Sequence, residues 1–274
     1  MEKDNKTIRK KNKVYPKEIT ELIDNMSLMD DELMARVFNE NIPATQLLIS
    51  TILSRDVVIE SAKGQFDVKN PIVGGRNIRL DIFAREEQGN YFNCEVQRSD
   101  DGAKPARARF HSAMLDSRML EAGQRFSEIK DSYVIFITEK DYYNSGKALY
   151  LVERVVDNDK AFQDGNHIIY VNASYEGEDN LGRLLQDMRN KTKEGFNYKE
   201  LEESVRHFKD TSEGREIMSE AVERYAKKYS EGQYDKGIID SIKNLMKNLK
   251  MTAEQAMDAI GVPQSERKKY MTML

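Results

Sequence analysis

The sequence predicts a mixed α/β fold, in which a mixed central sheet is flanked by helices and followed by an all-helical C-terminal extension. Three zones of apolar patterning indicate this architecture. Helical periodicity covers about 17–54, short β-branched and alternating runs cover about 55–175, and helical periodicity returns over 178–274. With 274 residues the chain is about twice the usual domain size. We therefore expect one large domain over 17–176 and a helical extension over 177–274.

The chain begins with a basic segment, for which we set the boundaries 1–16. Residues 1–18 carry seven lysines or arginines against three acids: Lys3, Lys6, Arg9, Lys10, Lys11, Lys13 and Lys17. This segment is either a solvated, disordered tail or an arm that grips phosphates. The whole chain has a formal net charge of −4, which argues against nonspecific coating of nucleic acid. Any contact with DNA must then come from local basic patches.

The first zone is expected to form helices that lead into the sheet. Leu22, Met26, Met29, Leu33 and Val37 recur at three- and four-residue steps, as on one face of a helix. Pro43 is expected to divide this zone into two helices.

The second zone supplies the strands of the predicted sheet. Two turn signals, Gly74-Gly75 and Gly89-Asn90, bracket an alternating run over 78–83 and precede a returning strand over 91–97, so these segments should form a hairpin. A helix over about 104–122 follows. The remaining expected strands are 57–59, 133–138, 150–156 and 167–171.

The third zone ends in a long helix and two short ones. Ile238, Ile242, Leu245 and Leu249 form an amphipathic stripe, and short helices are expected over 252–260 and 263–271. The last pair, with its cations Arg267, Lys268 and Lys269, is either a helix-turn-helix that reads DNA or a small packing and dimerisation element. This extension is our candidate for a homo-oligomer contact.

Two acidic positions on the predicted hairpin carry the main chemical signal. Asp81 interrupts one strand, and Glu95 and Gln97 lie two residues apart on the returning strand, so their side chains share a face. Two carboxylates held together are unfavourable unless a cation neutralises them, and oxygen ligands favour Mg²⁺ or Mn²⁺. The alternative places both acids on the solvent side of the sheet, paired with Arg79 or Arg98.

The surrounding sequence resembles a known nuclease group. Asn77–Arg98, followed by Arg107–Phe110 and Tyr133–Thr138, is similar to the Rpn, or transposase-associated, branch of the PD-(D/E)XK nuclease superfamily. The segment Asp31–Phe38 also resembles the Asp-x-x-Phe-x-x-x-Phe helix of that branch, with Met34 in place of the first Phe. The resemblance covers about 30–175 and depends on the order and spacing of several motifs together.

The resemblance implies a restriction-endonuclease-like core that hydrolyses DNA phosphodiesters with Mg²⁺ or Mn²⁺, linked to mobile elements or recombination. Asp81 and Glu95 match the metal-binding acids, and Val96 would lend its carbonyl. Gln97 stands where the superfamily usually has a catalytic lysine. Asp31 on the lead-in helix is the further acidic candidate, with Glu40 competing for that role.

Two departures from the superfamily pattern affect the implied activity. Leu80 stands where the superfamily name has Pro, and Gln97 replaces Lys, as it does in this branch. The amide removes a positive charge that would stabilise the transition state, so slow or conditional cleavage is expected. The alternative function is a catalytically weakened nuclease fold that binds DNA or protein.

Basic residues on the helix after the hairpin are candidates for DNA contacts. Lys104, Arg107 and Arg109 lie on or beside a side of this helix that could hold phosphates. The equally open alternative is an ordinary solvated face, salt-bridged to Asp116 and Glu121.

Several other classes of protein and site are disfavoured. The single cysteine, Cys94, allows no intramolecular disulfide and fits a reducing cytoplasm. His111, His167 and His207 lack the spacing of a zinc site. No apolar run is long enough to span a membrane, and no P-loop follows a predicted strand.

Overall fold

The computed structural model describes residues 15–157 and 159–274. The basic segment considered above lies outside this range, apart from the residues after position 14. The described chain forms two compact units, which divide between Ser219 and Glu220. None of the helices in these two ranges combines the length and the apolar character needed to cross a membrane.

The first unit is built on a six-stranded mixed sheet with the order β1-β2-β3-β4-β8-β5. The first three strands are antiparallel, β3, β4 and β8 are parallel, and β5 is antiparallel to β8. Their bounds are β1 Ile59–Val68, β2 Ile78–Glu86, β3 Tyr91–Gln97, β4 Ser132–Thr138, β5 Leu149–Val152 and β8 Asn166–Asn172. A small separate hairpin joins β6 Val155–Val156 to β7 Lys160–Ala161. The predicted mixed sheet flanked by helices is therefore confirmed.

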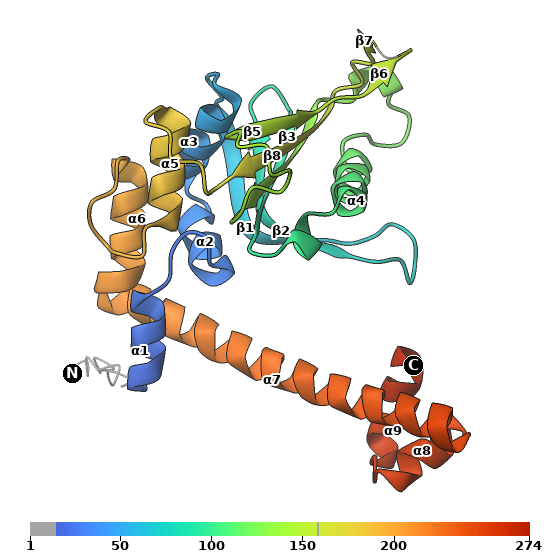
Figure 1. Cartoon of the computed structure of the whole chain (residues 1–274). Helices are drawn as coiled ribbons and strands as arrows, with labels where there is room; N and C mark the ends of the chain where they lie inside the picture. Colours follow the sequence, from blue (N-terminus) through green and yellow to red (C-terminus); the bar gives the residue numbers. More distant parts are fainter. Residues whose placement is uncertain (1–14, 158) are drawn as a thin grey trace, which may run out of the picture. The chain divides into compact units, whose positions relative to one another are not determined.

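Helices cover both faces of this sheet (Figure 1). Helix α4, Pro105–Asp116, packs on one face, where Leu115, Val134 and Phe136 belong to one apolar core. Helices α2, Asp31–Phe38, and α3, Ile42–Leu53, contact β1 on the other side. Two helices matter most for the site. Helix α4 lies behind β3, and helix α2 lies beside β1 and β2.

The lead-in contains three helices where the sequence predicted two. Helix α1, Lys17–Asp24, ends before a turn in which the Asp30 carboxylate accepts hydrogen bonds from the Ser27 N–H and hydroxyl. This local bond competes with helix continuation, which explains the break before α2. Asn41 then caps α3 by accepting from the Ala44 N–H.

Two further helices of the first unit pack beside α2 and α3, although the sequence analysis assigned them to the extension. They are α5, Asn180–Arg189, and α6, Lys199–Asp210. Buried Lys209 connects distant segments here, since its Nζ donates to the carbonyls of Asp24, Met26 and Lys191 at 2.5–3.0 Å. Burial lowers the pKa of Lys209 to about 8.

The second unit consists of the later part of α7, Ser212–Leu249, with α8, Ala253–Ala259, and α9, Gln264–Met273. Ile242 of the predicted stripe is buried against Met257, Val262 and Tyr270. Thr252 forms the predicted capping box with Gln255.

The cations of the last helix are largely engaged within the second unit. Arg267 pairs with Asp258 at 2.5 Å, and Lys269 pairs with Asp235 at 2.6 Å. These contacts favour the packing alternative over a helix that reads DNA.

Candidate active site

The two acids singled out from the sequence lie where strands β2 and β3 separate. The last paired positions are Ile82 and Cys94, so Asp81 and Glu95 occupy the next opposite positions. At these positions main-chain N–H groups bond to a carboxylate of the opposite strand and not to its backbone carbonyls. The Asp81 N–H donates to Glu95 Oε1 at 3.3 Å, and the Val96 N–H donates to Asp81 Oδ2 at 3.1 Å. The two carboxylates therefore converge, as the hairpin predicts.

Burial makes this pair electrostatically unfavourable on its own. The Glu95 side chain is fully buried, and Asp81 is mostly covered. Burial raises the pKa of Asp81 to about 8, assisted by the negative charges of Glu95 and Asp31. The Val96 N–H and the guanidinium of Arg107 oppose this rise. An acid with such a pKa holds its proton at neutral pH unless a cation arrives.

Arg107 of α4 is the cation nearest to the pair. Its Nη2 donates to Glu95 Oε2 at 2.8 Å, and its Nη1 lies 3.5 Å from Gln97 Oε1. Asn93, Glu95 and Gln97 alternate along β3 and face α4 together. The sequence grouped Arg107 with an outer basic face of the helix, and the structure places its guanidinium against the acids.

His111 extends this network one helical turn further along α4. Arg107 Nε donates to His111 Nε2 at 3.3 Å. The other ring nitrogen, Nδ1, lies 3.5 Å from Glu95 Oε1 and 3.0 Å from Asn93 Nδ2. All three of His111, Asn93 and Glu95 are buried. His111, which Asn93 contacts, fixes the orientation of the Glu95 carboxylate from its buried side.

Sequence reasoning did not assign His111 and Asn93 to the site. The i, i+4 spacing of Arg107 and His111 was the available signal, because it places both side chains on one face of the helix.

Gln97 is positioned by a close approach of the backbone. A Cβ on Gly102, in the 3₁₀ turn Asp100–Ala103, would lie 1.7 Å from Gln97 Oε1, so any larger residue there would force the Gln97 amide to move. The turn leads from β3 into α4. It holds the amide beside Arg107 at the edge where β3 ends.

Asp31 opens helix α2 near the pair. Burial raises its pKa, and neighbouring Glu32, Asp30 and Glu95 raise it further. Glu40, the competing candidate, follows the other end of α2, where its N–H donates to the Ala62 carbonyl. Asp31 is thus the helix acid whose charge acts on Asp81.

Arg98 follows Gln97 and forms ion pairs with two acids outside the Asp81–Glu95 pair. It pairs with Asp30 at 2.7 Å and with Glu139 at 3.5 Å, joining the start of α2 to the end of β4. The alternative in which Arg79 or Arg98 neutralises Asp81 and Glu95 is not what the structure shows, because Arg79 pairs with Asp67. Lys104, at the N-cap of α4, and Arg109, on α4, are exposed, and their contact with a phosphate backbone remains a prediction.

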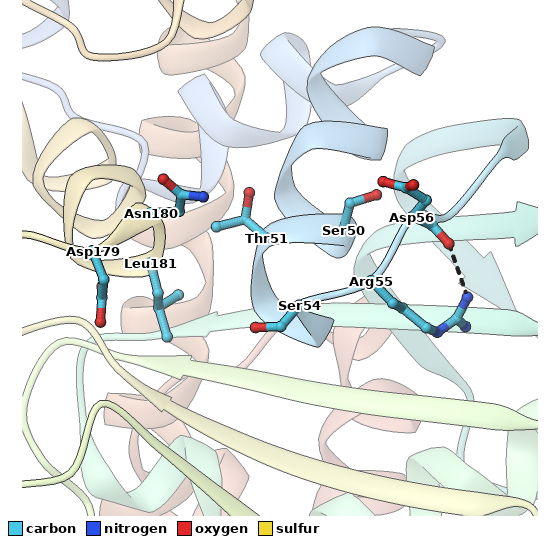
Figure 2. Close-up of a pocket in the computed structure, with 8 residues that line it drawn as sticks. All are labelled: Ser50, Thr51, Ser54, Arg55, Asp56, Asp179, Asn180 and Leu181. Carbon is cyan, nitrogen blue, oxygen red and sulfur yellow. Dashed lines mark hydrogen bonds between the residues drawn. The ribbon is translucent and has the colours of Figure 1, made fainter.

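A cavity beside the helices of this unit is separate from the acidic pair. A cavity of about 550 Å³ lies between the end of α3 and the start of α5 (Figure 2). It shares no residue with the acidic pair, since its lining consists of Ser50, Thr51, Ser54, Arg55, Asp56, Asp179, Asn180 and Leu181. The acids instead lie at the open end of a hairpin.

This arrangement of acids at the end of a hairpin, with a helix behind the second strand, agrees with a comparison of the sequence with protein families. The model of the PD-(D/E)XK nuclease family transposases matches residues 35–235, nearly three quarters of the chain. The chain belongs to this family. The matched range includes Asp81, Glu95, Gln97 and Arg107, and it begins after Asp31. No curated protein and no solved structure matches the chain.

Members of PD-(D/E)XK families use divalent metals, and the donors present here suit a hard cation. Within the described ranges, no three His, Cys, Asp or Glu side chains gather as a metal-binding group. The set is smaller: the carboxylates of Asp81 and Glu95, next to the main chain of Val96, whose N–H donates to Asp81. Mg²⁺ commonly takes only one or two carboxylates and keeps several waters, so this donor set fits Mg²⁺ or Mn²⁺.

Proposed function

We propose that this family member is a metal-dependent DNA endonuclease that hydrolyses phosphodiester bonds, with a role in mobile-element or recombination processes. The observation that carries the proposal is the convergence of Asp81 and Glu95 at the point where β2 and β3 separate. Two buried carboxylates with a raised pKa at Asp81 are a typical functional site, and the family supplies the reaction class.

Each residue of the candidate site has its own role in this proposal. Asp81, Glu95 and the Val96 carbonyl would hold Mg²⁺ or Mn²⁺, which when bound polarises a phosphodiester and lowers the pKa of water. His111 and Asn93 orient Glu95 from the buried side. Gln97 offers a neutral amide that can orient a phosphate or a water and cannot act as a base. Lys104 and Arg109 are the proposed contacts to the DNA backbone.

A plasmid assay tests this function directly. Purified protein with Mg²⁺ or Mn²⁺ should nick or linearise supercoiled plasmid, and Asp81→Asn and Glu95→Gln should each remove cutting. Glu87→Gln is the matched control, because Glu87 is an exposed acid at the turn of the same hairpin. Equal cutting by wild type and the two site variants would reject the assignment.

A second function is favoured by the residues that surround Glu95. The Glu95 carboxylate is bound to Arg107, and the lysine position holds Gln97, so the site carries no lysine to assist the reaction. A nuclease fold that binds DNA without cutting it would have this appearance. It predicts DNA binding that depends on Lys104 and Arg109, no plasmid cleavage, and no heat of Mn²⁺ binding that depends on Asp81.

A further inference from the structure

Arg107 is partly exposed to solvent and forms an ion pair with the buried acid Glu95. Its side chain is 39% exposed, whereas the Glu95 side chain that it contacts is 0% exposed. The bond to Glu95 Oε2 is short, at 2.8 Å, and the contacts to His111 and Gln97 are longer, at 3.3 and 3.5 Å. One strong contact therefore holds a guanidinium whose other side faces water.

The charges around the pair show what this contact does. Three acids, Asp31, Asp81 and Glu95, act on one another, and Arg98 is occupied by Asp30 and Glu139. Arg107 is thus the counter-ion of Glu95 in the structure. A divalent cation at Glu95 would have to share or displace that guanidinium, since two cations at one carboxylate repel each other.

DNA offers Arg107 a second partner. Guanidinium groups bind phosphate oxygens with the same geometry that they use for carboxylates. A phosphate that engages Arg107 from the solvent side weakens its hold on Glu95, and a metal at Glu95 in turn releases Arg107 for the phosphate.

We propose that Arg107 is an exchangeable counter-ion that closes the metal site in the absence of DNA and makes metal binding and DNA binding reinforce each other. This inference rests on the proposed function, because it assumes that Asp81 and Glu95 bind the metal. Such coupling is reciprocal, so each ligand raises the affinity for the other by the same factor. It would favour metal binding by protein that is already on DNA.

Calorimetry with Mn²⁺ tests the coupling without measuring cleavage. The full chain is titrated alone and after saturation with a short phosphorothioate duplex, which keeps its charge and resists hydrolysis. Wild type should bind Mn²⁺ roughly tenfold more tightly with the duplex, within the usual range of coupling between sites. Arg107→Ala should bind Mn²⁺ roughly tenfold more tightly than wild type without DNA, and should gain clearly less from the duplex.

Matched variants separate the possible outcomes. Arg85→Ala removes an exposed arginine that forms an ion pair with Glu60 away from the site, and it should keep both the wild-type Mn²⁺ affinity and the gain from the duplex. Arg107→Gln keeps a hydrogen-bond donor without the charge and should behave like Arg107→Ala. Asp81→Asn shows which heat belongs to the site.

Three results would overturn the inference. If Arg107→Ala and Arg107→Gln bind Mn²⁺ no more tightly than wild type, Arg107 is a structural support, and the proposed function stands. If both variants fail to fold, the arginine is not exchangeable. If neither wild type nor any variant binds Mn²⁺, with or without the duplex, the proposed function fails together with the inference.

Discussion

Replacing Asp81 with asparagine should change how the stability of the metal-free protein depends on pH. Burial, Glu95 and Asp31 raise the pKa of Asp81 from 3.8 to about 8. Between these values the folded chain keeps a proton that the unfolded chain has already released. The free energy of unfolding should therefore fall as the pH rises through this window, and it should level off above about pH 8.

The size of the effect follows from the linkage relation. Each pH unit within the window costs about 1.4 kcal/mol of stability for one group. The interval from about pH 5 to about pH 7 lies within the window, so wild type should lose about 3 kcal/mol from this group. Asparagine has no proton to release and still offers an oxygen to the Val96 N–H, so the Asp81→Asn variant should lack this loss.

Urea unfolding in EDTA at several pH values measures this difference. Tyrosine circular dichroism is a suitable signal, because the chain has 13 tyrosines and no tryptophan. Glu87→Gln, an exposed change on the same hairpin, controls for the loss of one carboxylate. A stability difference between Asp81→Asn and wild type that stays constant from about pH 5 to about pH 7 would refute the reasoning.

Three further predictions concern positions that support the packing of the first unit or the position of Gln97. Lys209→Ala should destabilise the protein by about 2–4 kcal/mol in urea unfolding, because it leaves three backbone carbonyls without their donor. Gly64→Ala should cost about 1–3 kcal/mol in the same assay, since the new Cβ would lie 2.0 Å from the Ala35 carbonyl oxygen of α2. Gly102→Ala should displace Gln97 and reduce plasmid cleavage about tenfold or more, with an unchanged far-ultraviolet spectrum.

The hairpin could be predicted because its determinants are local. The turn at Gly89-Asn90 and the apolar alternation of β2 fix which residues face each other, so a sequence is sufficient to place Asp81 opposite Glu95. In the structure each of these acids accepts a hydrogen bond from a main-chain N–H of the other strand. Their catalytic role stays a proposal.

Strand β1 was largely missed, because its stability comes from distant residues. The sequence indicated only 57–59, whereas β1 runs from Ile59 to Val68 and contains Gly64 and several polar residues. Its backbone pairs along most of β2 and approaches helix α2 at Gly64. These contacts override the weak local preference for a strand.

Helix α4 shows the same limit for Arg107, a residue of the candidate site. The sequence predicted a helix over about 104–122, and the helix ends at Asp116. Its spacing placed Arg107 among outward cations, because Ala-rich apolar positions do not define clearly which side faces the sheet. Only the packing of α4 against β4 shows that Arg107 and His111 point toward Glu95.

The reciprocal bonds at the end of the β2–β3 hairpin have an evolutionary consequence. Asp81 and Glu95 each accept a hydrogen bond from a main-chain N–H, so both positions serve folding as well as the proposed chemistry. A lineage that abandoned cleavage would still be selected to keep an oxygen at each position, and the amides Asn and Gln would supply it. Replacing an acid by its amide is therefore the substitution by which such a chain would lose cleavage with the smallest loss of stability.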